Sequence, residues 1–251
     1  MNAAPADPEV IAHRGYAARY PENTLAAIEA ALAAGARYVE FDVQLTRDGV
    51  PVLLHDRDLA RTTGRPGDVT EWDLAAVQAL GAGEPARFGT RFAGEPVPTL
   101  AAVAARLARH PQVTAFVEIK EESLERFGTE ATVRAVLTAI EPARAHCVPI
   151  SFSEEAVRCA RASGAAAIGW VLDTLDTAHR DRAQALAPAY LFCDHRDVLT
   201  RPGRLWPGPW RWAVYEVTTA ALARELAARG AGFVETMAVG ELLAELAGSR
   251  R

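Results

Sequence analysis

The sequence predicts an α/β fold, namely a (β/α)8 TIM barrel with a small insertion after the second barrel strand. Three observations support this fold class. The chain has 251 residues, which is the usual size of such a barrel. Strand-like and helix-like segments alternate from end to end, which implies parallel strands. Nine segments are strand-like, and a hairpin signal sets one of them apart, so that eight remain to close a barrel.

The elements follow one another in a regular order. The first strand-like segment is 9–13, and an Ala-rich helical pattern at 23–35 follows it, with Gly35 as a stop signal. The second barrel strand is expected at 38–45. The later barrel strands are expected at 113–120, 147–152, 166–173, 189–194, 211–217 and 232–236, and the clearest further helical patterns at 100–110, 129–141, 153–163 and 219–229.

Residues 50–56 form the strand-like segment that is set apart. Asp48-Gly49 is a two-residue hairpin signal, so this segment should fold back antiparallel on 38–45. With that loop, Asp42 lies directly opposite His55, and Glu40 shares their face because side chains alternate along a strand. A three-residue loop would shift the register by one residue and send His55 to the other face.

The insertion is expected to span 46–98, within a single catalytic domain of residues 1–251. It consists of the return strand and of an irregular stretch, 57–98, that is rich in Gly and Pro. Loops of this length usually carry function or small structure of their own. We therefore expect this stretch to cap one end of the barrel.

Composition excludes several classes of partner. The net charge is −5, with 27 Lys and Arg against 32 Asp and Glu, and there is no basic run, so neither a nucleic acid nor an anionic membrane is expected as a partner. The three cysteines match neither a zinc site nor a disulfide framework. No apolar run reaches membrane-spanning length and the N-terminus lacks signal-peptide features, so we expect no stable membrane insertion and a cytoplasmic location. The sequence does not indicate the oligomeric state.

Charged side chains gather where a barrel enzyme places its site, at the carboxyl ends of the strands. Three of them are carboxylates at equivalent levels of neighbouring strands, Glu40, Asp42 and Glu118. One buried carboxylate alone is as often a structural ion-pair partner, but three together repel one another unless a cation lies among them. Oxygen ligands suit a hard divalent ion, so we expect Mg²⁺ or Ca²⁺ here.

Two histidines and two cationic residues should reach the same end of the barrel. His13 and His55 can give or take a proton near neutral pH, so beside a metal site they are typical of an acid–base pair, although each alone would be a core or capping histidine. Arg14 and Lys120 add permanent positive charge and can hold an anion. The combination points to phosphoryl chemistry.

The motifs "IAHRG", "PENT", "VEFDVQLTRDGVPVLLHD" and "VEIK", in this order over 11–120, resemble the glycerophosphodiester phosphodiesterases. The resemblance implies a (β/α)8 barrel with an insertion after its second strand, and hydrolysis of glycerophosphodiesters to sn-glycerol 3-phosphate and an alcohol. By position, it implies the metal ligands Glu40, Asp42 and Glu118, the acid–base pair His13 and His55, and the phosphate-binding residues Arg14 and Lys120. Glu22, in "PENT", would be a direct or indirect partner of this site, or simply a residue at the start of a helix.

The C-terminal half resembles the family more loosely. Tyr215 stands where many members have Trp, Glu216 where they have Thr, and Met237 where they have Asp. These departures leave open which alcohol is released. Tyr215 and Glu235 could line the pocket, with packing the favoured interpretation for Tyr215. The tryptophans of 204–212 are expected to pack over the barrel rim rather than to wall the pocket.

Several points of mechanism and function stay open at the level of the sequence. The nucleophile could be water or the substrate's own 2-hydroxyl, which would first give a cyclic phosphate. Either histidine could be the base. Two other functions would use similar residues, namely a non-catalytic phosphodiester-binding barrel and a barrel metalloenzyme of another class, such as a sugar isomerase.

Overall fold

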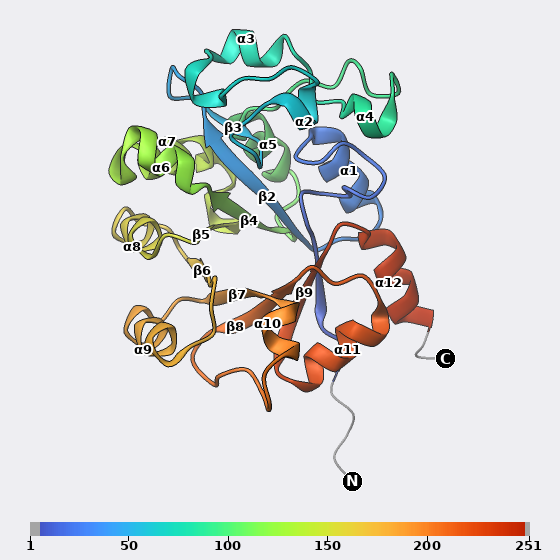
Figure 1. Cartoon of the computed structure of the whole chain (residues 1–251), viewed down its shortest axis with the longest axis vertical. Helices are drawn as coiled ribbons and strands as arrows, with labels where there is room; N and C mark the ends of the chain where they lie inside the picture. Colours follow the sequence, from blue (N-terminus) through green and yellow to red (C-terminus); the bar gives the residue numbers. More distant parts are fainter. Residues whose placement is uncertain (1–5, 249–251) are drawn as a thin grey trace.

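The structure, a computed structural model, describes residues 6–248 and confirms the predicted barrel (Figure 1). Eight parallel strands form a closed sheet, because β1 pairs with β9 on one side and with β2 on the other. Every segment predicted to be a strand contains one. The barrel strands are β1 (Glu9–Ala12), β2 (Tyr38–Leu45), β4 (Thr114–Ile119), β5 (Cys147–Ser151), β6 (Gly169–Val171), β7 (Tyr190–Asp194), β8 (Arg211–Tyr215) and β9 (Ala231–Thr236).

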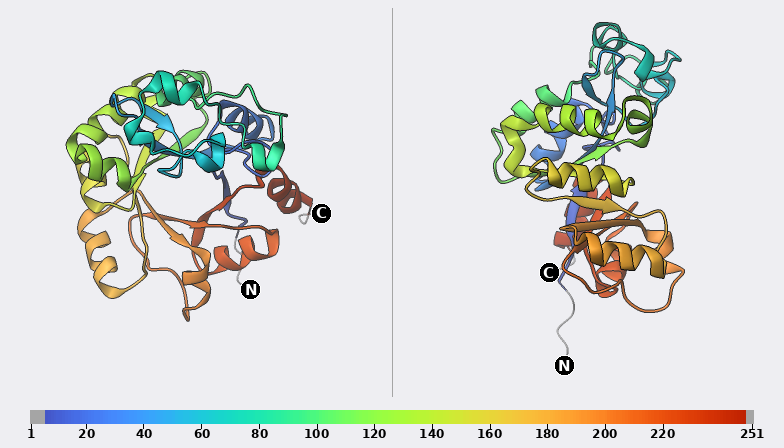
Figure 2. Two further views of the ribbon diagram at one scale, coloured as in Figure 1. Left: turned by 45° about the horizontal axis from the view of Figure 1, so that its top comes forward. Right: turned by 90° about the vertical axis from the view of Figure 1, so that its left-hand side faces the viewer.

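Helices surround the strands on the outside, as Figure 2 shows. The longer ones are α1 (Leu25–Ala33), α5 (Leu100–Leu107), α7 (Thr129–Ala139), α8 (Glu154–Ala162), α9 (Thr177–Leu186), α11 (Ala220–Ala228) and α12 (Val239–Gly248). Shorter ones are α6 (Glu121–Phe127), α10 (His195–Leu199) and the 3₁₀ segment η2 (Glu141–His146). Side-chain caps begin several of them; the hydroxyl of Thr24, for example, accepts a hydrogen bond from the N–H of Ala27 at the start of α1.

The barrel has one apolar layer outside its strands and another inside. Val39, Phe41 and Val43 of β2 pack outward with the helices, so the residues between them face the interior. Inside, Phe116 stacks edge-on against Phe192 at 5.1 Å between ring centroids, within a cluster of aromatic side chains. These rings fill the middle of the barrel, which leaves the carboxyl ends of the strands as the place for a cavity.

The return strand β3 (Pro51–Leu53) pairs antiparallel with β2, as predicted, but the predicted register is wrong. Val43 pairs with Leu53, which places Leu54 rather than His55 opposite Asp42. The N–H of Thr46 donates to the carbonyl of Val50, so the loop has three residues, 47–49, and ends on Gly49 with φ of 76°. A three-residue loop that ends on a left-handed glycine satisfies the Asp-Gly signal as well as a two-residue loop does.

The cap formed by 57–98 contains four short helical segments instead of being wholly irregular. They are α2 (Ala60–Thr63), the 3₁₀ segment η1 (Val69–Glu71), α3 (Leu74–Gln78) and α4 (Pro85–Phe88). A small apolar cluster joins the cap to the return strand; it is formed by Val52, Leu54, Leu59, Val69, Val77, Ala82 and Val97. It lies beyond one end of the barrel body (Figure 2).

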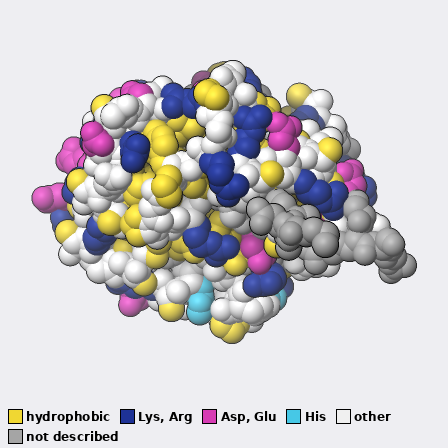
Figure 3. All heavy atoms as spheres, turned by 90° about the horizontal axis from the view of Figure 1, so that it is seen from below, with side chains coloured by type: hydrophobic (Ala, Val, Ile, Leu, Met, Phe, Trp, Pro, Cys, Tyr) yellow, Lys and Arg dark blue, Asp and Glu magenta, His cyan; other side chains and the backbone are white. Residues whose placement is uncertain are grey.

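Three further features of the structure bear on the sequence predictions. Trp210 and Trp212 are buried, and the ring of Trp206 packs against that of Trp212 with 5.7 Å between the ring centroids. These rings therefore pack at the rim of the barrel, which is the favoured of the two interpretations. On the face seen in Figure 3, outside the grey residues, basic side chains are interspersed with apolar and acidic ones. Within residues 6–248, every helix is too short or too polar to cross a bilayer.

Candidate active site

A cavity of about 260 Å³ opens at the carboxyl ends of the barrel strands. It gathers most of the side chains that the sequence singles out. The residues that line it include His13, Arg14, Asp42, His55, Glu118, Lys120, Tyr215 and Glu235. Glu40 and Glu22 are buried, and each accepts a hydrogen bond from Arg14, which lines the cavity.

The three carboxylates of the expected metal site converge. Alternation along β2 points Glu40 and Asp42 to the same face, and Asp42 pairs with Glu118 in the register of β2 and β4. One oxygen from each lies within 4.8 Å of the others, and Oε1 of Glu40 is buried without a hydrogen-bond partner in the described structure. This oxygen-only donor set fits a hard divalent cation.

The electrostatics of the three carboxylates differ. Burial raises the pKa of Glu40 well above its ordinary value, and the charge of Asp42 raises it further. Burial also raises the pKa of Glu118, against the opposing charge of Lys120. Burial acts on Asp42 in the same direction, but Arg14 and Lys120 outweigh it and lower the pKa of Asp42. A group of carboxylates that resists full ionisation is the situation that a bound cation relieves.

Arg14 and Lys120 line the cavity and also contact the carboxylates. Nζ of Lys120, the chain's single lysine, lies 2.7 Å from Oε1 of Glu118 and 3.4 Å from Oδ1 of Asp42. Nη1 of Arg14 donates to Oε1 of Glu22 at 2.9 Å, and Nε of Arg14 lies 3.2 Å from Oδ2 of Asp42. In the structure, both positive charges therefore compensate buried carboxylates while they line the cavity.

A tight turn after β1 places His13 and Arg14. Arg14 and Gly15 both have positive φ, 54° and 77°, and the N–H of Arg14 donates to Oε2 of Glu40 at 3.1 Å. A Cβ on Gly15 would lie 2.7 Å from the carbonyl carbon of Ala27 in α1. Only glycine combines that conformation with that close approach, which explains the residue that follows the His-Arg pair.

In each of the two cavity histidines, His13 and His55, Nδ1 contacts a carboxylate. Nδ1 of His13 contacts Oε1 of Glu216, and its Nε2 lies 3.6 Å from Oε2 of Glu40. Nδ1 of His55 lies 2.6 Å from Oδ1 of Asp56. Such contacts select the tautomer and ring orientation that leave Nε2 for chemistry. Burial, with a smaller contribution from the Arg14 charge, lowers the pKa of His13 to about 3.

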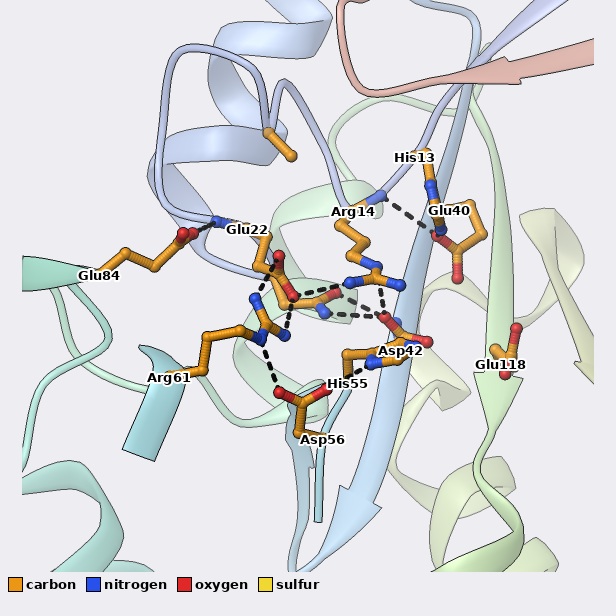
Figure 4. A network of polar contacts seen from close by, with 12 residues as sticks. His13, Arg14, Glu22, Glu40, Asp42, His55, Asp56, Arg61, Glu84 and Glu118 are labelled. Carbon is orange, nitrogen blue, oxygen red and sulfur yellow. Dashed lines mark hydrogen bonds and ion pairs between the residues drawn. The ribbon is translucent and has the colours of Figure 1, made fainter. Parts of the chain in front are cut away.

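His55 reaches the cavity although the predicted register is wrong. The ladder between β2 and β3 ends at Leu53, so the face taken by His55 no longer follows from the pairing. Figure 4 shows the His55 ring beside Asp42. The predicted convergence of Glu40, Asp42 and His55 therefore occurs, but for a different reason from the one that the sequence suggested.

Asn23 is a site residue to which the sequence analysis gave no role. It has φ of 56°, and its side chain lies against Asp42 with 2% of its surface exposed. Its Nδ2 donates to Oδ2 of Asp42 at 2.9 Å, and its Oδ1 accepts from the N–H of Asp42 at 3.1 Å. An Asn just before the capping residue Thr24, where a left-handed conformation is tolerated, is the signal that could have identified it.

Glu22 is one of a group of charged residues that link the barrel to the cap. Its carboxylate pairs with Arg14 and with Arg61 of α2, and its backbone N–H donates to Oε1 of Glu84 at 2.5 Å. Glu22 thus contacts the site through Arg14. No sequence pattern indicates a role for Asp56, Arg61 or Glu84, since their contacts depend on how the cap is placed over the barrel.

Tyr215 and Glu235 belong to the same cavity. Tyr215 packs on the interior aromatic cluster and also lines the cavity, so packing is only part of its role. Glu235 is 3% exposed, and its Oε1 has no hydrogen-bond partner in the described structure. Burial raises the pKa of Glu235 well above its ordinary value, and the charge of Glu118 adds to this.

Comparison with known proteins identifies the family. The family model of the glycerophosphoryl diester phosphodiesterase family matches residues 13–146. The chain belongs to this family. The matched segment contains the three carboxylates, both histidines and the cationic residues Arg14 and Lys120. The cavity residues Tyr215, Glu216 and Glu235 lie outside it.

Two curated relatives align with the N-terminal part of the chain. The glycerophosphodiester phosphodiesterase of Caldanaerobacter subterraneus subsp. tengcongensis is 48% identical over 91 residues, which cover 36% of this chain and 37% of that protein. Mouse glycerophosphodiester phosphodiesterase 1 is 41% identical over 110 residues, 44% of this chain and 33% of that protein. The chain thus aligns with less than half the length of either relative.

Solved structures extend the similarity over the whole fold. A phosphodiesterase from Oleispira antarctica in complex with the product sn-glycerol-3-phosphate superposes with a TM-score of 0.82 at 26% identity, covering 96% of this chain and 97% of that one. A glycerophosphodiester phosphodiesterase from Agrobacterium tumefaciens str. C58 gives 0.75 at 26% identity, covering 94% and 99%. The resemblance seen in the motifs is confirmed at the level of the family and the fold.

Proposed function

We propose that this chain is a metal-dependent phosphodiesterase, a single catalytic domain with the insertion 46–98, that hydrolyses glycerophosphodiesters to sn-glycerol 3-phosphate and an alcohol. One observation carries the proposal. Three converging carboxylates, two of which line one cavity, lie beside two carboxylate-bound histidines and two cationic side chains of that cavity, in a chain of this family. The product bound to the Oleispira antarctica phosphodiesterase supports the assignment of the phosphate-containing product.

The residues that would hold the metal are Glu40, Asp42 and Glu118. Their oxygen-only donor set and the unpartnered Oε1 of Glu40 suit Mg²⁺ or Ca²⁺. When bound, such an ion supplies positive charge that draws the diester to the site and polarises its phosphoryl oxygens.

The chain's own residues account for the other requirements of the reaction. Arg14 and Lys120 offset the negative charge that grows on the non-bridging oxygens in the transition state. One histidine takes the proton of the nucleophile and the other gives a proton to the leaving alkoxide, and each such transfer typically contributes ~100- to 10,000-fold in rate. Glu216 and Asp56 hold the two rings at Nδ1, so that Nε2 of each is the atom that moves the proton.

A coupled assay for sn-glycerol 3-phosphate tests this function. A panel of glycerophosphodiesters with choline, ethanolamine, glycerol or inositol as the alcohol would be tested with and without Mg²⁺ or Ca²⁺. We expect metal-dependent release of the product from at least one of them, and a cyclic phosphate trapped at early times would identify the 2-hydroxyl as the nucleophile. Tight diester binding without hydrolysis would support a binding barrel instead, and sugar-phosphate turnover without diester cleavage would support an isomerase.

A further inference from the structure

Arg61, in the cap helix α2, joins two carboxylates that each hold a different residue of the active site. Its Nε donates to Oδ2 of Asp56 at 2.6 Å. Its Nη1 and Nη2 donate to the two oxygens of Glu22, at 2.8 and 2.7 Å. All three nitrogens of the guanidinium are therefore engaged with carboxylates (Figure 4). This planar fork is an arrangement that lysine cannot reproduce.

The other contacts of these two carboxylates lead directly into the cavity. Oδ1 of Asp56 lies 2.6 Å from Nδ1 of His55, while Oδ2 of the same group receives Arg61. Oε1 of Glu22 accepts from Nη1 of Arg14 at 2.9 Å. The result is one continuous line of hydrogen bonds from His55 through Asp56, Arg61 and Glu22 to Arg14.

We propose that Arg61 is a positioning residue that holds His55 and Arg14 in a fixed relation to each other, which makes the cap a part of the catalytic apparatus. The inference rests on the proposed function, in which His55 transfers a proton and Arg14 faces the phosphate. Without Arg61, the Asp56 carboxylate is free to turn and the His55 ring turns with it. Glu22 then keeps Arg14 as its main cationic partner, and that pairing draws Arg14 from the cavity.

Exposure distinguishes this role from that of a stabilising ion pair. The side chain of Arg61 is 42% exposed and that of Asp56 is 33% exposed. The ion pair between these two side chains is open to water and contributes little to the stability of the fold. The pair with Glu22 differs, because Glu22 is 4% exposed, but Glu22 keeps Arg14 as a partner when Arg61 is lost. Loss of Arg61 should therefore lower the stability only through its contact with Glu22, while it disturbs both His55 and Arg14 at the site.

The cap offers a matched control. Arg57 lies four positions earlier, is 48% exposed and pairs with Asp68, a carboxylate of the cap itself. Arg57→Met removes the same kind of exposed ion pair from the same segment without touching the line to His55 and Arg14. It should leave hydrolysis at the wild-type level.

The test compares wild type, Arg61→Met, Arg61→Lys and Arg57→Met for kcat, KM, thermal midpoint and calorimetric affinity for sn-glycerol 3-phosphate. We expect Arg61→Met to lower kcat by about 10- to 100-fold, the usual loss when a group that orients a functional side chain is removed. Its affinity for sn-glycerol 3-phosphate should also fall, while the variant still unfolds cooperatively above the assay temperature, with a thermal midpoint below that of Arg57→Met only by the contribution of the Glu22 pair. If Arg61→Met fails to fold, Arg61→Lys, which keeps the charge but not the fork, should show the same loss in smaller measure.

A double-mutant cycle shows whether the effect passes through His55. Because His55→Ala already removes the group that Arg61 orients, adding Arg61→Met should cost much less than it does in the wild type. Losses that multiply independently would overturn the inference, as would a variant at Arg61 with wild-type kcat and product affinity. A wild-type protein that hydrolyses no diester would instead overturn the proposed function, so the two failures are distinguishable.

Discussion

Replacement of Asn23 by alanine should damage both the fold and the metal site. Asn23 is buried and makes two hydrogen bonds with Asp42, one from its amide to the carboxylate and one from the backbone N–H of Asp42 to its carbonyl oxygen. Alanine removes both, and it also places an ordinary side chain at φ of 56°. The Asp42 side chain then loses the contact that orients it, and Asp42 belongs to the cluster of carboxylates that would hold the cation.

The size of the effect follows from these contacts. A lost hydrogen bond to a charged group costs ~1.5–3 kcal/mol, and a buried N–H left without a partner costs ~1–3 kcal/mol. The left-handed conformation adds ~1–2 kcal/mol for a residue with a Cβ that lacks asparagine's local bonding. Together these contributions reach ~3.5–8 kcal/mol, but contributions that share one side chain are not additive. We therefore expect Asn23→Ala to lower the free energy of unfolding by the lower part of that range, about 3.5 to 5 kcal/mol, which corresponds to a thermal midpoint lower by roughly 7 to 20 °C in a chain of this size. Affinity for Mg²⁺ or Ca²⁺ should fall ~10- to 100-fold.

Denaturant unfolding followed by two spectroscopic probes measures the first quantity, and calorimetric titration with the divalent ion measures the second. Asn23→Gly is the matched control, because it loses the same hydrogen bonds but adopts positive φ without strain, so it should be destabilised less than Asn23→Ala. If Asn23→Ala unfolds within ~0.5 kcal/mol of the wild type, the range of an ordinary surface substitution, and binds the ion equally well, the reasoning fails.

Three further predictions concern the same site. Gly15→Ala forces a Cβ to within 2.7 Å of the Ala27 carbonyl carbon at φ of 77°, so stability and hydrolysis should both fall; a wild-type thermal midpoint would contradict the clash. A chelator should abolish hydrolysis and Mg²⁺ or Ca²⁺ should restore it, and activity that survives exhaustive chelation would argue against a cation at the carboxylates. Burial alone would raise the pKa of Glu22, but Arg61 and Arg14 outweigh it and hold the pKa below its ordinary 4.5. The ionised form therefore stabilises the fold above that pH, and this contribution is lost as the pH falls through the lowered pKa. The stability difference between wild type and Glu22→Gln, measured by urea unfolding, should shrink below about pH 4.5; a difference that is constant with pH would refute this.

Much of the fold was predictable because it depends on short-range patterns. Each strand carries its own apolar run and each intervening segment its own helical period, so all nine strands could be located before their pairing was known. The period of two was enough to place Glu40 and Asp42 on one face. The short helices of the cap were missed because segments such as Ala60–Thr63 and Pro85–Phe88 are too short to show a period.

The hairpin shows where local reasoning fails. Asp48-Gly49 indicates a turn, but two loop lengths satisfy the signal, and a difference of one residue decides which side chain lies opposite Asp42. His55 reaches the cavity only because the ladder ends at Leu53 and the chain then turns with the cap. The contact of Glu216 with His13 likewise joins residues that directly follow β8 and β1 and lie 203 positions apart in the chain.

The sequence by itself determined the barrel, the family and the chemical types at the cavity, because alternation along a strand and the order of strands suffice to bring those side chains to one end. Only the tertiary structure decided which partner each of them has: Asn23 for Asp42, Asp56 for His55, and Arg61 for Glu22. These contacts depend on loops whose directions are set by the packing of the cap and the turns on the barrel, and no periodic signal in the chain encodes such directions.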